Sequence, residues 1–252
     1  MEFQVGASAE AGTNKALSED CCLVQIEQTV HGKACMGIVC DGVGGLEYGH
    51  KASSYVVKRL SDWFKTIAEV KFELTDVLLE QIDFEIENIN KELIRMGEDV
   101  GSRMGTTLSG IILVGGQYFL FHVGDTRVYL CTKELRCLTF DHTVLATKIR
   151  NGQMTEEEAK RTKEKPVLLQ CIGATQNLEI QNMCGEVMKN DVFLLCSDGL
   201  YKSLNFGEIE DITEEIKYME EEEIQHIADE MIVEVKSRGE LDDVSAIFIK
   251  AL

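Results

Sequence analysis

The sequence predicts an α+β fold in which two antiparallel sheets pack together and helices cover them. Short runs rich in Val, Ile, Phe and Cys, bounded by Gly or Asp, lie toward both ends of the chain and are typical of buried strands. Two long segments between these runs carry apolar residues at spacings of three and four, which indicates helices with one buried face. Strands and helices that alternate in blocks of this kind form packed layers.

The expected strands are apolar runs that end at a turn residue. In chain order they are CCLVQI, ACMGIVC, TTLSGIILVG, QYFLFHV, RVYLC, DVFLLC and VSAIFIKA. The third and fourth of these runs meet at Gly115 and Gly116, a glycine pair that favours a tight hairpin turn.

The expected helices are defined by their apolar periodicity. The first covers about residues 48–70, and its repeating positions are Ala52, Val56, Leu60, Trp63 and Ile67. The second covers about residues 75–96, with Leu78, Ile82, Ile86, Ile89 and Leu93 at the same rhythm. A third, more acidic helical region covers about residues 207–237, before the last strand.

Composition limits both the architecture and the partners. The 252 residues contain one proline and no Ser/Gly-rich linker, so we expect a single domain over 1–252. The formal net charge of -19 argues against nucleic acid or an anionic membrane as the main partner. No apolar run reaches the roughly 18 residues of a membrane span, and the first residues do not resemble a signal peptide.

The nine cysteines lie mostly inside apolar runs, and no pair forms C-x-x-C. We therefore expect small, reduced core residues in a cytoplasmic protein rather than disulfides or a zinc site. A phosphatase that uses a cysteine nucleophile is disfavoured because no cysteine is followed by arginine at the spacing C-x5-R.

Acidic residues stand beside strand ends at five places along the chain. They are Glu19 and Asp20, Asp41, Asp125, Asp198, and Asp242 with Asp243. Each of them alone is an ordinary turn residue. Several such ends at one edge of the sheets would bring like charges together, and a cation must then offset a repulsion of several kcal/mol. Oxygen ligands without His or Cys predict Mg²⁺ or Mn²⁺.

The glycine-rich stretch DGVGG after the strand supports a metal site over a phosphate loop. Without a side chain, Gly42 lets its carbonyl approach an ion that Asp41 also holds. One carboxylate between two ions about 3.5–4 Å apart makes a site that activates water for attack on phosphorus. Neither G-x-x-x-x-G-K-[ST] nor G-x-G-x-x-G is completed here, so the phosphate-loop alternative fails on spacing.

The chain resembles the metal-dependent protein Ser/Thr phosphatases of the type-2C class (PPM), in their bacterial short form. The motifs that carry the resemblance are SED at 18–20, DGVGG at 41–45, GTTL from Gly105, VGDTRVY from Val123, LTFDHT from Leu138, CIGA from Cys171, CSDGL from Cys196 and DDVSAI from Asp242. The resemblance implies a four-layer α-β-β-α sandwich with the ions in a cleft at one end of the sheets. It also implies a flap segment at about 141–170 beside the active site.

The same resemblance implies a role for each acid. Asp41 would bridge two ions, with Gly42 giving its carbonyl to one of them. Asp198 and Asp242 would hold the other ion, so that Asp41 and Asp198 become the catalytic pair around an activated water.

Three further acids complete the implied metal site. Glu19 and Asp20 would support the ion on the side of Gly42. Asp125, together with Asp198, would match the acids that hold a third, looser ion in bacterial members of the family.

Three positions depart from the family pattern. Lys15 stands where the family has its phosphate-binding arginine; a lysine holds phosphate as a point charge without the bidentate fork, so weaker substrate binding is expected. Val43 stands where many animal members have a histidine that is proposed as the general acid. Asp243 replaces an asparagine, and this extra acid would either tighten metal binding or raise the pKa of a neighbour.

Three other polar residues are interpreted as structural. His122 lies in an apolar run and is expected to be a satisfied core histidine. His142 is expected to order its loop together with Asp141, and Arg127 to form a structural ion pair.

The function expected first is a Mg²⁺- or Mn²⁺-dependent phosphatase of phosphoserine and phosphothreonine proteins, monomeric, with a cognate Ser/Thr kinase acting on the same proteins. Two alternatives stay open. The first is a catalytically impaired module that binds phosphoproteins, which the departures at Lys15 and Asp243 would support. The second is a hydrolase of non-protein phosphoesters with the same site chemistry.

Overall fold

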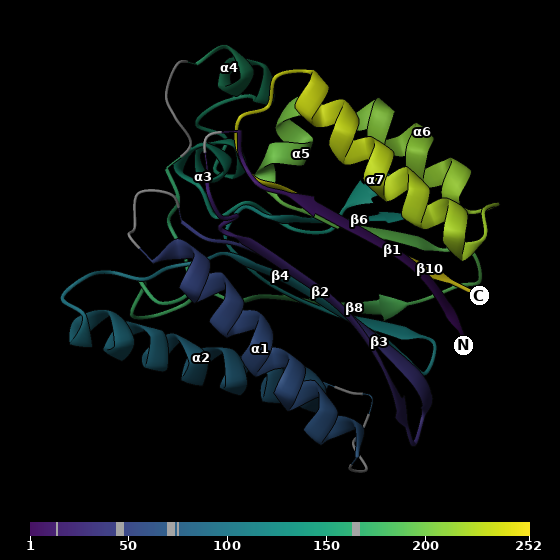
Figure 1. Cartoon of the computed structure of the whole chain (residues 1–252), viewed down its shortest axis with the longest axis horizontal. Coiled ribbons are helices and arrows are strands. Elements are labelled where there is room, and N and C mark those ends of the chain that lie inside the picture. Colours follow the sequence, from purple (N-terminus) through teal and green to yellow (C-terminus); the bar gives the residue numbers. More distant parts are fainter. Residues whose placement is uncertain (14, 44–47, 70–73, 75, 163–166) are drawn as a thin grey trace.

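The computed structural model describes residues 1–252 except 14, 44–47, 70–73, 75 and 163–166. Two sheets stack face to face, and helices cover the outer face of each, which gives four layers (Figure 1). The predicted α+β sandwich of two antiparallel sheets flanked by helices is therefore confirmed. No helix in the described ranges is long and apolar enough to cross a membrane.

Each sheet has five strands, and every neighbouring pair within the described strands is antiparallel. The first sheet has the spatial order β1 (Phe3–Glu10), β10 (Val244–Ala251), β9 (Val192–Cys196), β6 (Arg127–Cys131) and β7 (Leu135–Cys137). The second has the order β2 (Asp20–Thr29), β3 (Gly32–Asp41), β4 (Leu108–Val114), β5 (Gln117–Val123) and β8 (Gln181–Glu186). Strands from both ends of the chain thus meet in one sheet.

The helices divide between the two outer faces. The second sheet is covered by α1 (Gly49–Ala68) and α2 (Asp76–Asp99), as Figure 1 shows. The first sheet is covered by α5 (Asp198–Ser203), α6 (Phe206–Ile216) and α7 (Glu221–Ser237). Two short helices, α3 (Val144–Arg150) and α4 (Glu156–Arg161), lie in the segment expected to be the flap.

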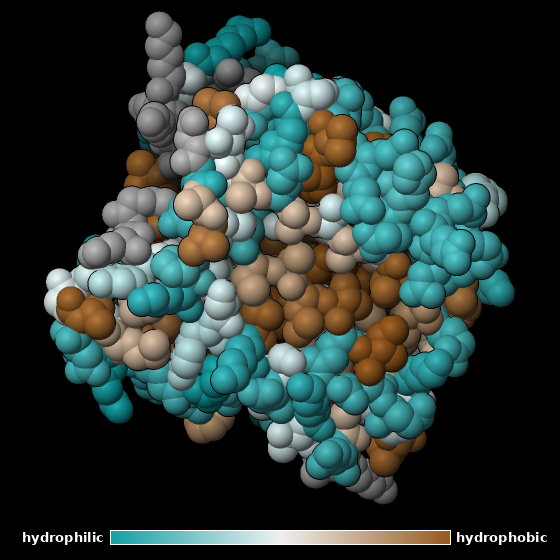
Figure 2. All heavy atoms as spheres, in the orientation of Figure 1, coloured by the Kyte–Doolittle hydropathy of each residue, from teal (hydrophilic) through white to brown (hydrophobic). Residues whose placement is uncertain are grey.

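The apolar residues form three layers of core. One lies between the sheets, with Val39, Leu120 and Ile247 among its fully buried side chains. The other two lie between a sheet and its helices. Each fully buried aliphatic side chain contributes about 1.5–3 kcal/mol. Figure 2 shows apolar side chains at the centre of one face, over the strands between the two helical layers, with polar side chains around them.

Most predicted elements are present, but the last predicted helix is divided, and strands β1, β7 and β8 and the short helices α3, α4 and α5 were not predicted. The hairpin at Gly115 and Gly116 is confirmed, and both glycines have positive φ angles of 58° and 79°, which glycine adopts without a steric cost. The acidic region at 207–237 is two helices rather than one. Glu220 begins the second helix through a reciprocal capping box with Glu223.

The longest of the strands that were not predicted is β1. Its sequence, FQVGASAE, is built of small residues between Phe3 and Glu10, so its apolar alternation is weak. The strand exists because it pairs along its full length with β10, a contact that only the folded topology supplies.

Candidate active site

The strand end at Asp41 is held rigidly while its carboxylate is left free. Asp41 N donates to Thr107 Oγ1 (2.9 Å), and Thr107 N donates to Asp41 O (2.8 Å). Thr106 Oγ1 also donates to Asp41 O (2.9 Å). Within the described part of the chain, no hydrogen bond reaches the Asp41 carboxylate. A carboxylate on a fixed backbone with unused lone pairs is suited to ligate a cation.

Two further acids carry buried oxygens without a hydrogen-bond partner. Asp20 lies directly opposite Asp41 in the β2–β3 ladder. Ser245 Oγ donates to Asp20 Oδ2 (2.7 Å), but Asp20 Oδ1 is buried and unpartnered. Asp198, the first residue of α5, receives Lys202 Nζ on Oδ2, and its Oδ1 is likewise buried and unpartnered. Buried oxygens of this kind are costly unless a ligand satisfies them, so this donor set fits a hard cation.

The charges of these acids act on one another. Burial and the charges of Asp20, Asp198, Asp125 and Asp242 raise the pKa of Asp41 well above its usual range. Burial, with the nearby charges of Asp243 and Asp198, raises the pKa of Asp20 to about 7. Acids from distant parts of the sequence therefore converge on one region, as predicted.

These acids lie near one another, but their side chains do not form a complete set of metal ligands. No group of three His, Cys, Asp or Glu side chains within the described ranges has an arrangement that could hold a metal ion. Bare carboxylates repel one another, and a bound cation would offset that repulsion. Two lysines also occupy part of the region: Lys202 pairs with Asp198, and Lys15 donates to Glu19, Asp242 and Asp243.

Gly42 permits a close approach of three backbone segments. A Cβ there would lie 2.5 Å from the Gly49 carbonyl carbon and 2.8 Å from Glu19 O. Gly42 N donates to Glu19 O (3.0 Å), which ties the acid-bearing start of β2 to the end of β3. The rest of the predicted glycine loop, at 44–45, lies outside the described residues.

Asp125 stands at the turn after β5, beside an aromatic and arginine cluster. Burial and the charges of Asp198 and Asp141 raise the pKa of Asp125 to about 7. Tyr201 Oη donates to Asp125 O (2.9 Å), and the Arg127 guanidinium lies 3.6 Å above the Tyr201 ring. Arg127 forms a bidentate pair with Asp141 (2.9 and 2.7 Å), so it is the structural ion pair that the sequence predicts.

The two central histidines are also structural. His122 is fully buried; its Nδ1 contacts Ser109 Oγ (2.9 Å) and its Nε2 contacts Phe140 O (3.1 Å). His142 Nδ1 accepts a hydrogen bond from Gly124 N (3.1 Å), which fixes the loop next to Asp125. Burial lowers the pKa of His142, so the ring is neutral at neutral pH.

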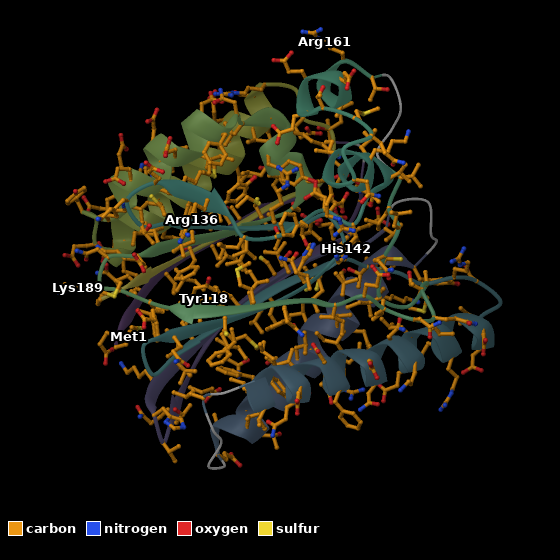
Figure 3. The ribbon with its side chains drawn as sticks, turned by 180° about the vertical axis from the view of Figure 1, so that it is seen from behind. Met1, Tyr118, Arg136, His142, Arg161 and Lys189 are labelled. Atoms are coloured by element: carbon orange, nitrogen blue, oxygen red, sulfur yellow. The ribbon has the colours of Figure 1, made fainter. Side chains whose placement is uncertain are left out.

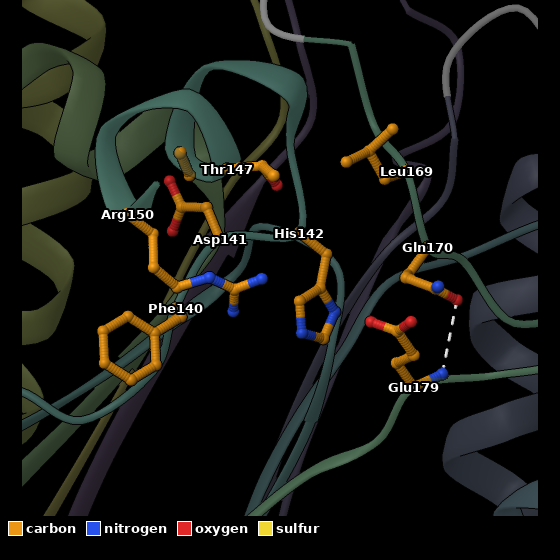
Figure 4. A pocket seen from close by; sticks show the side chains of 9 residues that line it. Phe140, Asp141, His142, Thr147, Arg150, Leu169, Gln170 and Glu179 are labelled. Carbon is orange, nitrogen blue, oxygen red and sulfur yellow. Dashed lines mark hydrogen bonds between the residues drawn. The ribbon is translucent and has the colours of Figure 1, made fainter. Parts of the chain in front are cut away.

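A cavity of about 410 Å³ adjoins this loop, between α3 and the segment around residues 169–179. In Figure 4 the Arg150 side chain points toward His142 beside the ring of Phe140, and Glu179 lies on the other side of His142. No hydrogen bond or ion pair joins the Arg150 side chain to another described residue. The cavity therefore presents a free guanidinium next to the acidic cluster.

Comparison with known proteins identifies the family. The family model for Protein phosphatase 2C matches residues 9–237. The chain belongs to this family. It is 33% identical over 218 residues to the serine/threonine phosphatase stp of Listeria welshimeri, an alignment that covers 84% of this chain and 83% of that protein.

Solved structures of serine/threonine phosphatases have the same fold. The serine/threonine phosphatase of S. agalactiae superposes with a TM-score of 0.85 at 25% identity, and all of both chains is covered. The catalytic domain of the serine threonine protein phosphatase PstP in complex with 2 manganese ions gives a TM-score of 0.78 at 25% identity, covering 98% of this chain and 97% of that one. The family and this neighbour support metal dependence.

Some contacts of the site could not be assigned from the sequence. Ser245, Thr107, Lys202 and Tyr201 all bond to a candidate acid or to its backbone. Of these, only Lys202 carries a local signal, since it stands four residues after Asp198 on one helix turn.

Proposed function

We propose that this protein is a serine/threonine protein phosphatase that hydrolyses phosphoserine and phosphothreonine with the help of bound Mg²⁺ or Mn²⁺. The observation that carries the proposal is the pair of buried, unpartnered carboxylate oxygens on Asp20 and Asp198, next to the free carboxylate of Asp41. When bound, such ions supply an activated water for attack on phosphorus and offset the charge on the phosphoryl oxygens.

Two ions would share the acids of the core site. Asp41 would lie between them, and the Gly42 carbonyl would face one of them. Glu19 and Asp20 would support that ion, Asp20 being oriented by the Ser245 hydroxyl.

The remaining acids would hold the other positions. Asp198 and Asp242 would bind the second ion. Lys202 would then release the Asp198 oxygen with which it pairs. Asp125, whose charge acts on Asp198, would join it in holding a third ion. Lys15 would contact the substrate phosphate.

The cavity beside α3 would receive the peptide that flanks the phosphorylated residue. Its wall is joined to the acidic cluster through the hydrogen bond from Gly124 to His142, one residue before Asp125. Arg150 would pair with an acidic side chain or a backbone carbonyl of the peptide. This assigns a substrate-binding role to the flap over about 141–170, of which residues 163–166 lie outside the described ranges.

The wider context is part of the same proposal. The chain would act as a single catalytic domain over 1–252, as a monomer in the cytoplasm, where it would reverse the action of a cognate Ser/Thr kinase. The net charge of -19 disfavours nucleic acid as a partner.

A turnover assay tests the proposal. The purified full chain with Mn²⁺ should hydrolyse p-nitrophenyl phosphate and a phosphothreonine peptide, and EDTA should abolish both activities. Metal binding without turnover on any phosphoester would favour a phosphoprotein-binding module instead. Turnover on small esters but never on phosphopeptides would favour a non-protein phosphoesterase.

A further inference from the structure

The Lys15 ammonium is enclosed by three carboxylates at the N-terminal side of the site. Lys15 Nζ donates to Glu19 Oε2 (2.9 Å), Asp242 Oδ1 (3.1 Å) and Asp243 Oδ2 (2.8 Å). An ammonium group has three N–H donors, so all of them are used. Glu19 and Asp242 are acids that the proposed function assigns to two different ions, and Lys15 thus bridges the two halves of the metal site.

Asp243 differs from these two acids because its own oxygens are fully engaged. Its side chain is 2% exposed, whereas that of Asp242 is 46% exposed. Asp243 Oδ1 accepts from Gly12 N (2.7 Å), and Oδ2 accepts from both Glu19 N (2.8 Å) and Lys15 Nζ. Both oxygens accept hydrogen bonds from the N-terminal segment and the side chain is buried, so its geometry is that of an anchor for the N-terminal loop.

The charge balance agrees with this role. Burial alone would raise the pKa of Asp243, but the hydrogen bonds from Lys15, Gly12 and Glu19 outweigh it and lower that pKa. Burial alone would lower the pKa of Lys15, and its three carboxylate partners raise it instead. Lys15 and Asp243 thus form an ion pair that two backbone N–H groups hold in place.

The residue types at these two positions match each other. An asparagine at 243 would have one oxygen and an NH₂ group, so its NH₂ would face either Gly12 N or the donors Glu19 N and Lys15 Nζ. Only a carboxylate accepts all three donors. An arginine at 15 would carry a planar guanidinium on a longer side chain. That group could not place a single point charge between the three carboxylate oxygens.

We propose that Asp243 is a positioning residue that holds the Lys15 ammonium against Glu19 and Asp242, so that Lys15 acts as a built-in cation until divalent ions take those carboxylates. This inference rests on the proposed function. Divalent binding then competes with Lys15 for Glu19 and Asp242, while the contact with Asp243 is retained. Once Glu19 and Asp242 bind the ions, the Lys15 ammonium remains at the edge of the site, where it can bind a phosphate.

Isothermal titration of Mn²⁺ into the EDTA-stripped full chain tests the competition. Lys15→Met should bind Mn²⁺ at least about fivefold more tightly than the wild type, because the competing cation is gone. Asp243→Asn should bind Mn²⁺ no more weakly than the wild type. Lys33→Met is the matched control. Lys33, at the start of β3, pairs with Glu2, so this variant should leave Mn²⁺ affinity unchanged.

Inhibition by inorganic phosphate tests the positioning. Lys15→Met and Asp243→Asn should each raise the inhibition constant for phosphate by about three- to tenfold, and the double variant should be no worse than Lys15→Met, because both act through one contact. The melting temperature without metal should fall in both single variants.

Three results would overturn the inference while leaving the proposed function intact. They are an unchanged or weaker Mn²⁺ affinity in Lys15→Met, a loss of tenfold or more in Asp243→Asn, and additive phosphate effects in the double variant. The second would identify Asp243 as a metal ligand. A wild-type chain that binds no Mn²⁺ would instead overturn the proposed function and the inference together.

Discussion

The Ser245 hydroxyl in β10 donates a 2.7 Å hydrogen bond to Asp20 Oδ2 in β2, and this contact joins the two sheets at the edge of the acidic cluster. Ser245 N in turn donates to Ser197 Oγ (2.9 Å), one residue before Asp198. Two candidate ligands on different sheets are therefore held in register through a single serine. A site assembled across two sheets depends on such contacts for its precision.

Replacing this serine should loosen the site without removing any ligand. We expect Ser245→Ala to lower the free energy of unfolding by about 1 kcal/mol, the net worth of one hydrogen bond. Because Asp20 is then held by neither oxygen, Mn²⁺ affinity should fall severalfold. Calorimetric titration and urea denaturation measure the two effects. Ser237→Ala, on the exposed end of α7, is the control and should change neither. An unchanged Mn²⁺ affinity in Ser245→Ala would show that Asp20 needs no support.

Removing the charge of Asp41 should have opposite effects on activity and on stability. Asp41→Asn should reduce phosphatase turnover by two or more orders of magnitude, because its carboxylate would lie between both ions. The metal-free variant should melt at a higher temperature than the wild type, since Asp20, Asp198, Asp125 and Asp242 all repel the buried charge.

Thermal melts in EDTA and turnover of a phosphothreonine peptide test both arms of this prediction. Asp62→Asn, on the exposed face of α1, should leave both unchanged. If Asp41→Asn melted at a lower temperature than the wild type in EDTA, the Asp41 carboxylate would be part of a stabilising network rather than an unpartnered metal ligand.

The acids of the site were predictable from the sequence because each follows or precedes an apolar run, and strand ends gather at sheet edges. The pairing of Asp20 with Asp41 follows directly from the two strands that carry them. The support of those acids was not predictable. Ser245 is 225 residues from Asp20 along the chain and reaches it only because β10 and β2 lie in facing sheets.

The role of Asp243 shows the same limit. In the sequence, Asp243 is a second acid beside Asp242. It could equally have been an additional metal ligand or a charge that raises the pKa of a neighbour. The backbone N–H groups of Gly12 and Glu19 favour an anchoring role, since each donates to one of its oxygens. Backbone donors have no signature in the sequence, so their effect on a side chain appears only in the fold.

Arg150 should matter for peptide substrates only. Arg150→Ala should raise the KM for an acidic phosphopeptide by about three- to tenfold and leave the kinetics of p-nitrophenyl phosphate unchanged, because that small ester has no flanking residues to enter the cavity beside α3. Figure 3 shows Arg161 at the tip of the flap segment, away from His142. Arg161→Ala, which removes only an exposed pair with Glu157, is therefore the control. Equal losses on both substrates would place Arg150 outside peptide recognition.

The buried His122 should make the protein less stable in acid. Burial and the neighbouring His142 lower the pKa of His122 from an ordinary 6.5 to about 3 in the folded protein. Between these two pH values the unfolded chain binds one more proton than the folded chain. Stability therefore falls as the pH decreases from about 6.5 toward 3, with a slope from this residue of about 1.4 kcal/mol per pH unit.

Urea denaturation of the metal-free protein at several pH values between 7 and 4 isolates this contribution. His122→Gln should be less stable than the wild type at pH 7, because Ser109 and Phe140 O lose well-placed partners. Toward pH 4, the free energy of unfolding of His122→Gln should fall less steeply than that of the wild type, by up to about 1.4 kcal/mol per pH unit. The two curves therefore converge in acid. Thr66→Val, near the exposed end of α1, changes no titratable group and should run parallel to the wild type. The carboxylates of the site titrate in the same range, but they are common to all three proteins and cancel in the differences. Parallel curves for His122→Gln and the wild type would mean that His122 takes up its proton at the same pH in the folded and unfolded states, so that burial does not lower its pKa.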